Sequence, residues 1–539
     1  MTLPPLVTSR LVTLSLLVAA VGLDVGPVAR AGGLGAGQGV GPGGSAGGGV
    51  LAAAIGALAG SMRRRRGLDG VGLGAHGAME RGPRSKPSNP GAQGRAPVSP
   101  RDGGPPQIHF VDAAELRAIV DARVLADARA MGPGAVRAPL HHAMGLGPPP
   151  AWSDGSLPDP GDRAGEEAAG ALYDLASGRV LLAATAATAA AARDDDATAR
   201  RIPGAARDLA PFVLCHALAL QILDRHFHLG PFLRDGQVPA PARPVRVRTA
   251  PGLVDADDGD AAVARQALVE GDALIQALEQ ILPDGMPSAR GLGLAADRVR
   301  ATLLSGPDDH SARDALHPDQ GIARARRLFP QTAGVAFVAA LRARWSWAEI
   351  DRALWSRPPA STEEVLHPDA YLRGEVPDPV ATRLPLGALG DWRVAAEDTL
   401  GELGVSAFLG PSVGEYRAAR AAAGWAGDRA VWLSSSRGGD APFAVWLTTW
   451  DDETDALDFA EQATVALATL TESSPPDALF IDPAGRRFAI ETAPRTVGLL
   501  FSAPEAGQAI LRRLIAAAVP VATASPAPGR APRARAARR

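Results

Sequence analysis

The sequence predicts an α+β protein that is mostly helical, in which a helical domain precedes a small domain with an antiparallel sheet. Between residues 185 and 350, apolar residues recur at helical spacing over long stretches. After about Gly390, short runs rich in Val, Phe and Trp lie between turn residues, as in strands joined by hairpins. Hydrophobic residues make up 46% of the 539 residues, which is enough for domains with sizeable cores.

The N-terminus has the three-part layout of a secretory signal peptide. Arg10 precedes the apolar residues 11–23, and Ala-Arg-Ala at residues 29–31 is a small-x-small cleavage site. The apolar run is shorter than the about 20 residues that a membrane span needs. We therefore expect residues 1–31 to be removed. The mature chain is then expected to be exported to the periplasm, the cell surface or the medium, without a transmembrane span.

The next segment has few residues that could form a core. Residues 32–107 are rich in Gly, Pro, Ala and Arg, which predicts a disordered linker. Within it, the apolar residues 50–59 and the basic residues 63–66 leave a second interpretation open, a contact with a membrane surface. At the other end, residues 521–539 carry five Arg and no acidic residue, which predicts a disordered basic tail.

The helical domain is predicted over residues 108–390. Its first helix is expected over residues 110–130, entered after Asp112. Residues 173–182 then indicate a turn at Ser177-Gly178 followed by a strand.

Most of the remaining helical domain is expected to be helical, with breaks at Gly230, Pro283 and Pro330. Asp260 is expected to cap the N-terminus of the helix that follows it. The pair His141-His142 precedes Gly and Pro residues and is expected in a loop.

The C-terminal α+β domain is predicted over residues 391–520. Its expected elements are strands over residues 431–434, 443–450, 488–491 and 497–502, a helix from Asp452 and a last helix ending at Ala518. Such an order favours an antiparallel sheet covered by helices.

The net charge and the number of cysteines bear on two properties, binding to nucleic acid and disulfide formation. The formal net charge is only −3, so nothing in the charge balance favours a nucleic-acid partner. Cys215 is the only cysteine, and an internal disulfide is therefore excluded.

Residues 214–229, LCHALALQILDRHFHL, are similar to the active-site helix of a zinc peptidase in which the general base and one zinc ligand have been replaced. In an H-E-x-x-H helix, two imidazoles one turn apart bind zinc and the Glu beside them acts as general base. With His216 at the first position, Ala217 stands where the Glu would be and Leu220 where the second His would be. A methyl group cannot accept a proton, and an isobutyl group has no lone pair for a metal.

The same stretch resembles the segment ALQDQHFDL, which follows HELTH in a family of uncharacterised, exported zinc metallopeptidases of the zincin type from bacteria and haloarchaea. The match at Asp224, His226, Phe227 and Leu229 places His216 on the first zinc ligand of that family. Further blocks resemble the family in the same order, at residues 173–182, 264–273, 357–372, 397–409, 421–433 and 445–459. The resemblance implies a zincin-like helical domain with a degenerate motif.

The resemblance also implies that Glu270, in the segment ARQALVEGDA, stands at the position of the third zinc ligand. Glu270 lies at the edge of an apolar helix face, where a carboxylate is unfavourable unless it is paired. Its partner could be His216 across the cleft or an arginine such as Arg265. A glutamate that simply reaches solvent is the third alternative.

A rebuilt metal site would have His216, Glu270 and His226 as ligands. His226 lies ten positions beyond His216 and turns away from its face in a regular helix, so the helix would have to end or bend before Asp224.

We therefore expect an exported, catalytically inactive metallopeptidase-like protein with no catalytic residues, metal or cofactor. It would act as a binding or structural module at the cell envelope, with an envelope or extracellular protein or peptide as partner. The alternative is an active zinc-dependent hydrolase with a rearranged site, whose candidate ligands are His216, Glu270 and His226.

Overall fold

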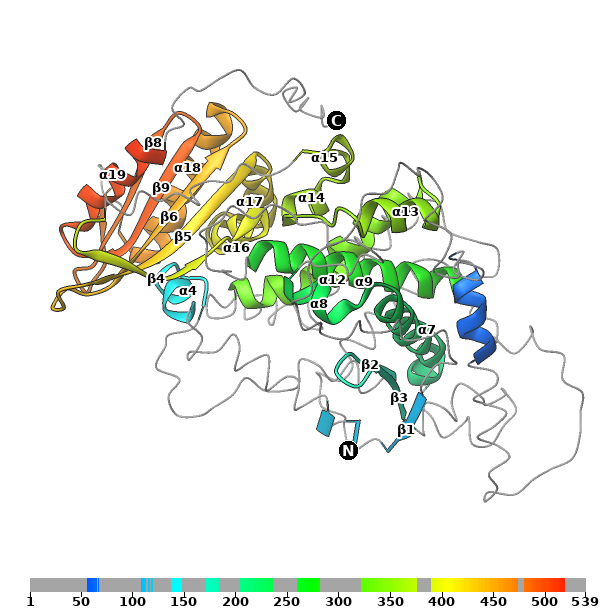
Figure 1. Cartoon of the computed structure of the whole chain (residues 1–539). Coiled ribbons are helices and arrows are strands. Elements are labelled where there is room, and N and C mark those ends of the chain that lie inside the picture. The colour runs from blue at the N-terminus through cyan, green and yellow to red at the C-terminus, as the bar shows by residue number, and fades with distance from the viewer. Residues whose placement is uncertain are drawn as a thin grey trace, which may run out of the picture.

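The computed structural model describes a helical domain beside a domain built on an antiparallel sheet, so the chain is of mixed α and β structure (Figure 1). The described residues are 56–64, 66, 108–112, 115–116, 118–119, 137–147, 171–183, 204–235, 259–281, 321–375, 389–473 and 479–518. The predicted signal peptide, the C-terminal tail and Pro283 lie outside these residues.

The helical domain is organised around long helices that pack along one another: α7 (Gly204–Phe227), α9 (Gly259–Ile281) and α12 (Gly321–Arg342). The backbones of α9 and α12 approach closely at a pair of glycines. A Cβ on Gly271 would lie 2.1 Å from the carbonyl oxygen of Gly334. Only glycine fits this crossing, which places α9, and with it Glu270, against its neighbours.

A small sheet covers α7. In the described residues it contains β1 (Ile108–Val111), β2 (Ala171–Asp174) and β3 (Arg179–Ala183), in the order β1-β3-β2. The β2–β3 hairpin turns at residues 175–178, which confirms the predicted turn. Gln221 of α7 donates to the carbonyl oxygen of Gly178, and this bond attaches the hairpin to the helix.

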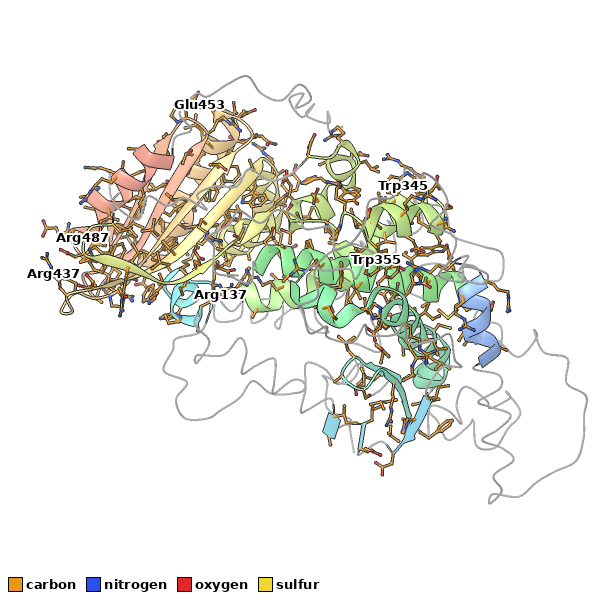
Figure 2. All side chains as sticks on the ribbon, viewed as in Figure 1. Arg137, Trp345, Trp355, Arg437, Glu453 and Arg487 are labelled. Carbon is orange, nitrogen blue, oxygen red and sulfur yellow. The ribbon has the colours of Figure 1, made fainter. Side chains whose placement is uncertain are left out.

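Shorter helices complete this domain and the connection to the next one: α4 (Ala138–Ala143), α8 (Leu229–Asp235), α13 (Trp347–Leu354), α14 (Thr362–Leu366) and α15 (Pro368–Arg373). Figure 2 shows Trp355, at the end of α13, within the helical domain, where it stacks on Phe227 with ring centroids 3.8 Å apart.

In the described residues, the C-terminal domain has a six-stranded sheet in the order β4-β5-β6-β9-β8-β7, and every neighbouring pair is antiparallel. The strands are β4 (Trp392–Asp398), β5 (Trp425–Ser435), β6 (Phe443–Trp450), β7 (Leu479–Ile481), β8 (Arg487–Ala493) and β9 (Thr496–Ala503). The predicted small antiparallel domain is thus confirmed.

Helices cover both faces of this sheet (Figure 1). Trp446, Phe501 and their neighbours pack against α16 (Gly401–Val413), α17 (Glu415–Ala422) and α18 (Glu453–Thr471). Val445 and Leu500 point to the opposite face and pack against α19 (Gly507–Ala518). This alternation of side chains along the strands gives the domain two apolar cores.

Several local expectations were wrong. Residues 108–111 form a strand paired with β3, so the helix does not begin at residue 110; its entry after Asp112 is confirmed, because the Asp112 carboxylate accepts from the backbone N–H of Glu115. Pro330 lies inside α12 without ending it. The break expected at Gly230 falls at His228, which has a φ of 54°. Asp260 is not an N-cap, because it lies within α9 and bonds to Thr362.

The expected linker is also wrong over one stretch. Residues 56–64 and 66 are helical, and we call them the N-terminal helical segment. Ala59, Met62 and Arg66 of this segment are buried against the helical domain, so Arg66 does not face a membrane surface. No helix in the described part of the chain is long and apolar enough to span a membrane.

Candidate functional site

The candidate site lies between α7 and α9. The face of α7 around His216 is apolar, because Leu223 is fully buried and Leu220 is partly buried against the same core. Ala217 is 2% exposed. The position of the missing Glu is therefore occupied by a core methyl group.

His216 and Glu270 meet across the two helices. The Nε2 atom of His216 lies 3.1 Å from Oε2 of Glu270, and their side chains are 23% and 21% exposed. Of the partners considered for Glu270, His216 is thus confirmed. Arg265 donates instead to the carbonyl oxygen of Leu233. The two residues placed on zinc-ligand positions by the family resemblance do come together, and they bond to each other directly.

A third ligand is not supplied by His226. The His226 ring packs edge-on against Phe227, with centroids 4.5 Å apart. Partial burial, together with the nearby charges of Arg66 and His228, lowers the pKa of His226 to about 4. Among the described residues, no group of three His, Cys, Asp or Glu side chains could hold a metal ion. The structure therefore does not bring His226 to His216 and Glu270.

Cys215, beside His216 in the sequence, is not available as a ligand or nucleophile in this fold. Its side chain is buried, and burial raises the pKa of the thiol to about 12. At neutral pH it stays protonated, whereas metals and electrophiles react with the thiolate.

Among the described side chains, the donors at this pair do not make up a zinc site. Zinc in proteins has at least three protein ligands, and here one imidazole and one carboxylate converge while Leu220 presents methyl groups. What this arrangement can do is form a hydrogen-bonded, partly exposed polar pair at the edge of an apolar core.

Asp224, which helped to fix the resemblance, has a structural role at the end of α7. One carboxylate oxygen accepts from the hydroxyl of Tyr173 at 2.6 Å, and the other accepts from the backbone N–H of Leu229 at 2.8 Å. The DRHFHL segment therefore joins the β2–β3 hairpin to the end of α7 and the start of α8.

Comparison with known proteins covers only the second domain. Residues 391–510 match a family described as a domain of unknown function (DUF8575). Neither the curated proteins nor the solved structures contain a match to the chain. The matched range begins at the strand β4 and ends within α19, so it corresponds closely to the sheet domain.

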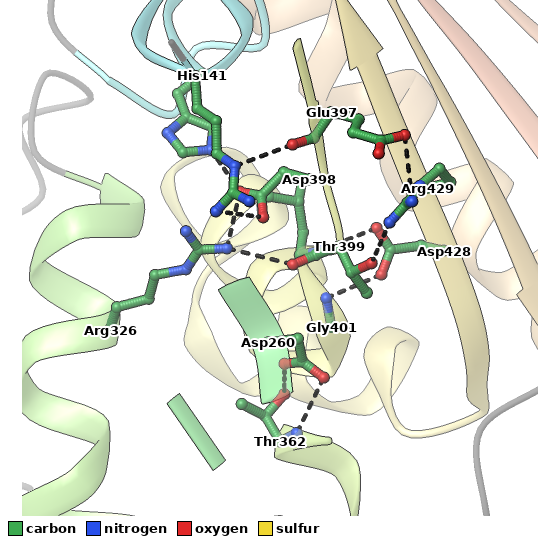
Figure 3. Close-up of polar contacts among 12 residues, drawn as sticks. His141, Asp260, Arg326, Thr362, Glu397, Asp398, Thr399, Gly401, Asp428 and Arg429 are labelled. Carbon is green, nitrogen blue, oxygen red and sulfur yellow. Dashed lines mark hydrogen bonds and ion pairs between the residues drawn. The ribbon is translucent and has the colours of Figure 1, made fainter. Parts of the chain in front are cut away.

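A second polar cluster, at the junction of the two domains, was missed by sequence reasoning (Figure 3). The buried Asp398, at the end of β4, lies 2.8 Å from Nε2 of His141 and accepts from Arg326 of α12 at 3.0 Å. Arg137 lies 3.5 Å from the other oxygen. His141 therefore belongs to a short helix and an ion-pair cluster, and the expectation of a loop pair was wrong.

The charges at this junction favour an ionised Asp398. Burial alone would raise the pKa of its carboxyl, but the charges and hydrogen bonds of Arg326, His141 and Arg137 hold it well below its usual range. A neighbouring carboxylate behaves differently: burial raises the pKa of Asp428 to about 6, against hydrogen bonds from the backbone N–H groups of Leu400 and Gly401. The junction cluster thus joins α4, α12 and the sheet by charge.

Proposed function

We propose that this chain is an exported, catalytically inactive relative of zinc metallopeptidases that acts as a binding or structural module at the cell envelope. The observation that carries the proposal is the direct hydrogen bond between His216 and Glu270, 3.1 Å long, beside Ala217 and Leu220. An envelope or extracellular protein or peptide would be its partner.

The loss of activity follows from two missing functions. A zinc hydrolase needs a metal held by three protein ligands and a base that takes a proton from the bound water. Leu220 cannot supply the third ligand, and Ala217 cannot supply the base. General acid-base catalysis alone contributes about 10²- to 10⁴-fold in rate, so restoring one function without the other leaves little turnover.

The alternative, an active zinc-dependent hydrolase with a rearranged site, needs a third ligand near the pair. His226 would have to leave its contact with Phe227 and approach His216. Nothing in the geometry of the pair requires that movement, because Glu270 already satisfies His216.

The test is to restore the missing groups in the full chain. We expect Leu220→His to take up about one zinc per chain, with His216 and Glu270 as the other ligands. We expect Ala217→Glu alone to take up none. Peptide cleavage should require at least the double variant, because it has both ligand and base. Zinc content is measured by elemental analysis and cleavage with a fluorogenic peptide mixture.

The matched control is Leu220→Ala, which opens the same space without adding a donor. It should remain free of zinc. If Leu220→His also refuses zinc while it stays folded, residue 220 does not converge with the pair and the proposed relation to a zinc site is wrong. If the unmodified chain cleaves peptides, the rearranged-site hydrolase replaces the proposal.

A further inference from the structure

The N-terminal helical segment buries one of its faces against the helical domain. Three of its buried residues, Ala59, Met62 and Arg66, are spaced by three and four positions, and their side chains therefore lie along one stripe of the helix. Arg64, off this stripe, is exposed. This one-sided burial is the way in which an amphipathic peptide helix binds a groove on another protein.

The Arg66 side chain lies among two carboxylates and two aromatic rings of the helical domain. The guanidinium donates to both carboxylate oxygens of Asp272, at 2.6 and 2.9 Å, and also to Asp351. Its central carbon lies 4.8 Å from the ring centroid of Trp347 and 5.6 Å from that of Phe227. We call the four side chains the acidic-aromatic pocket: Asp272, Asp351, Trp347 and Phe227.

The chemistry of the acidic-aromatic pocket selects a planar cation. The side chains of Arg66 and Asp272 are both fully buried, and an unpaired carboxylate at such depth is strongly unfavourable. Burial raises the pKa of Asp351 to about 6 even beside Arg66, and the charge of Asp272 adds to the rise. A guanidinium can bond to a carboxylate with two parallel N–H groups and stack its plane on an aromatic ring, whereas an ammonium is a point charge without this planar fork.

Arg66 is far in sequence from the residues that it contacts. Arg66 is separated from Asp272 by 206 positions and from Asp351 by 285. Residues 67–107, which lead from Arg66 to β1, are rich in Gly and Pro. The contacts of Arg66 are thus long-range.

We propose that the acidic-aromatic pocket is a binding site for an arginine side chain, and that the N-terminal helical segment occupies it as a separable peptide ligand. The site is separate from the His216–Glu270 pair. No hydrogen bond in the described structure joins any of its four side chains to His216 or Glu270. The ligand class is an apolar helical peptide with one inserted guanidinium.

The first test removes the Arg66 side chain by mutation and supplies its guanidinium group as a small molecule. Arg66→Ala in the full chain should lower the melting temperature, and millimolar ethylguanidinium should restore part of the loss with saturation. Ethylammonium, with equal charge but no planar fork, should restore less. Arg64→Ala is the matched control and should respond to neither compound. An Arg66→Ala protein as stable as Arg64→Ala, or one without saturable rescue, overturns the arginine site.

The second test keeps the native residues and asks whether the segment exchanges. A specific protease site is introduced within residues 67–107 of the full chain and cut after folding. The N-terminal piece should remain bound in size-exclusion chromatography and be displaced by a synthetic peptide of residues 54–68. The same peptide with Ala at position 66 should bind about 100-fold more weakly, as expected for loss of a buried ion pair. If cutting unfolds the body, or the bound piece never exchanges, the segment is an integral part of the core and the proposal is wrong.

Discussion

At the residue scale, two of the His–carboxylate pairs in the described structure, His216–Glu270 and His141–Asp398, differ in burial and therefore in their contribution to stability. His216 and Glu270 are both partly exposed, so solvent screens their attraction. The His141–Asp398 pair has a fully buried carboxylate that also receives Arg326. We infer that the first pair contributes little to stability and that Asp398 contributes much more.

The contribution of Asp398 to stability can be tested by replacing it and measuring the free energy of unfolding at several pH values. Its folded pKa lies below the unfolded value of about 4, so the stabilisation is complete above that value and is lost as the pH falls below it. Asp398→Asn should lower the free energy of unfolding at pH 7 by about 3 kcal/mol, as expected when one partner of a buried ion pair is removed. Its stability should also change less than that of the wild type between pH 5 and pH 3. Urea unfolding at each pH measures both effects.

The neighbouring residue supplies the control. Glu397 pairs with Arg429 at 3.1 Å but its side chain is 27% exposed. Glu397→Gln should cost no more than about 1 kcal/mol and leave the acid limb of the stability curve unchanged. Equal losses in the two variants would show that the junction is not held mainly through Asp398.

At the element scale, the crossing of α9 and α12 fixes where Glu270 stands. Gly271 follows Glu270 directly, and a Cβ there would collide with the carbonyl oxygen of Gly334. The glycine after Glu270 is therefore explained by helix packing.

Gly271→Ala should lower the free energy of unfolding by about 2 to 3 kcal/mol, because the helices must separate to admit the methyl group. Gly410→Ala, in α16, meets nothing within 4 Å outside its chain neighbours and should change the free energy of unfolding by no more than about 1 kcal/mol, because only the following Pro411 restricts the added methyl group. Thermal or chemical unfolding distinguishes them. A Gly271→Ala protein as stable as Gly410→Ala would contradict the close crossing.

The elements that sequence could predict are those set by local pattern. The β2–β3 turn, the strands β5, β6, β8 and β9, and the long helices α7 and α9 all have clear periodicity or turn residues. Elements fixed by distant partners were missed. The strand β1 exists because it pairs with β3 in parallel, and α12 continues through Pro330 because its packing on α9 outweighs the lost hydrogen bond.

The same division applies to the sites. The meeting of His216 and Glu270 could be predicted because the family resemblance supplied a contact that spacing alone could not. The Arg66 pocket and the Asp398 cluster join residues more than 70 positions apart, and each partner looks like an ordinary surface charge in the sequence. The burial of Ala59, Met62 and Arg66 on one helix face was hidden within a Gly-rich composition.

At the scale of the whole molecule, polar contacts join the helical domain to the sheet domain at several places. Besides the Asp398 cluster, His367 lies 3.0 Å from both carboxylate oxygens of Glu402 on α16. Asp260 of α9 accepts from the hydroxyl of Thr362, whose oxygen in turn accepts from the backbone N–H of Leu403. We infer that these contacts, together with the Asp398 cluster, hold the two domains to each other.

Export is the other whole-molecule expectation. The basic residue, apolar run and small-x-small site of residues 10–31 predict that an exporting host releases a chain beginning near Gly32. N-terminal sequencing of the secreted or periplasmic protein checks this. An intact Met1 on folded, exported protein would contradict it.

We propose that His216 and Glu270 satisfy each other by a hydrogen bond and hold no catalytic metal. This proposal is tested most directly by the zinc content of the unmodified full chain, purified without chelator and measured by elemental analysis together with His216→Ala. We predict substoichiometric zinc that is the same in both proteins. One zinc per chain in the wild type, lost in His216→Ala, would contradict the account and identify a working metal site.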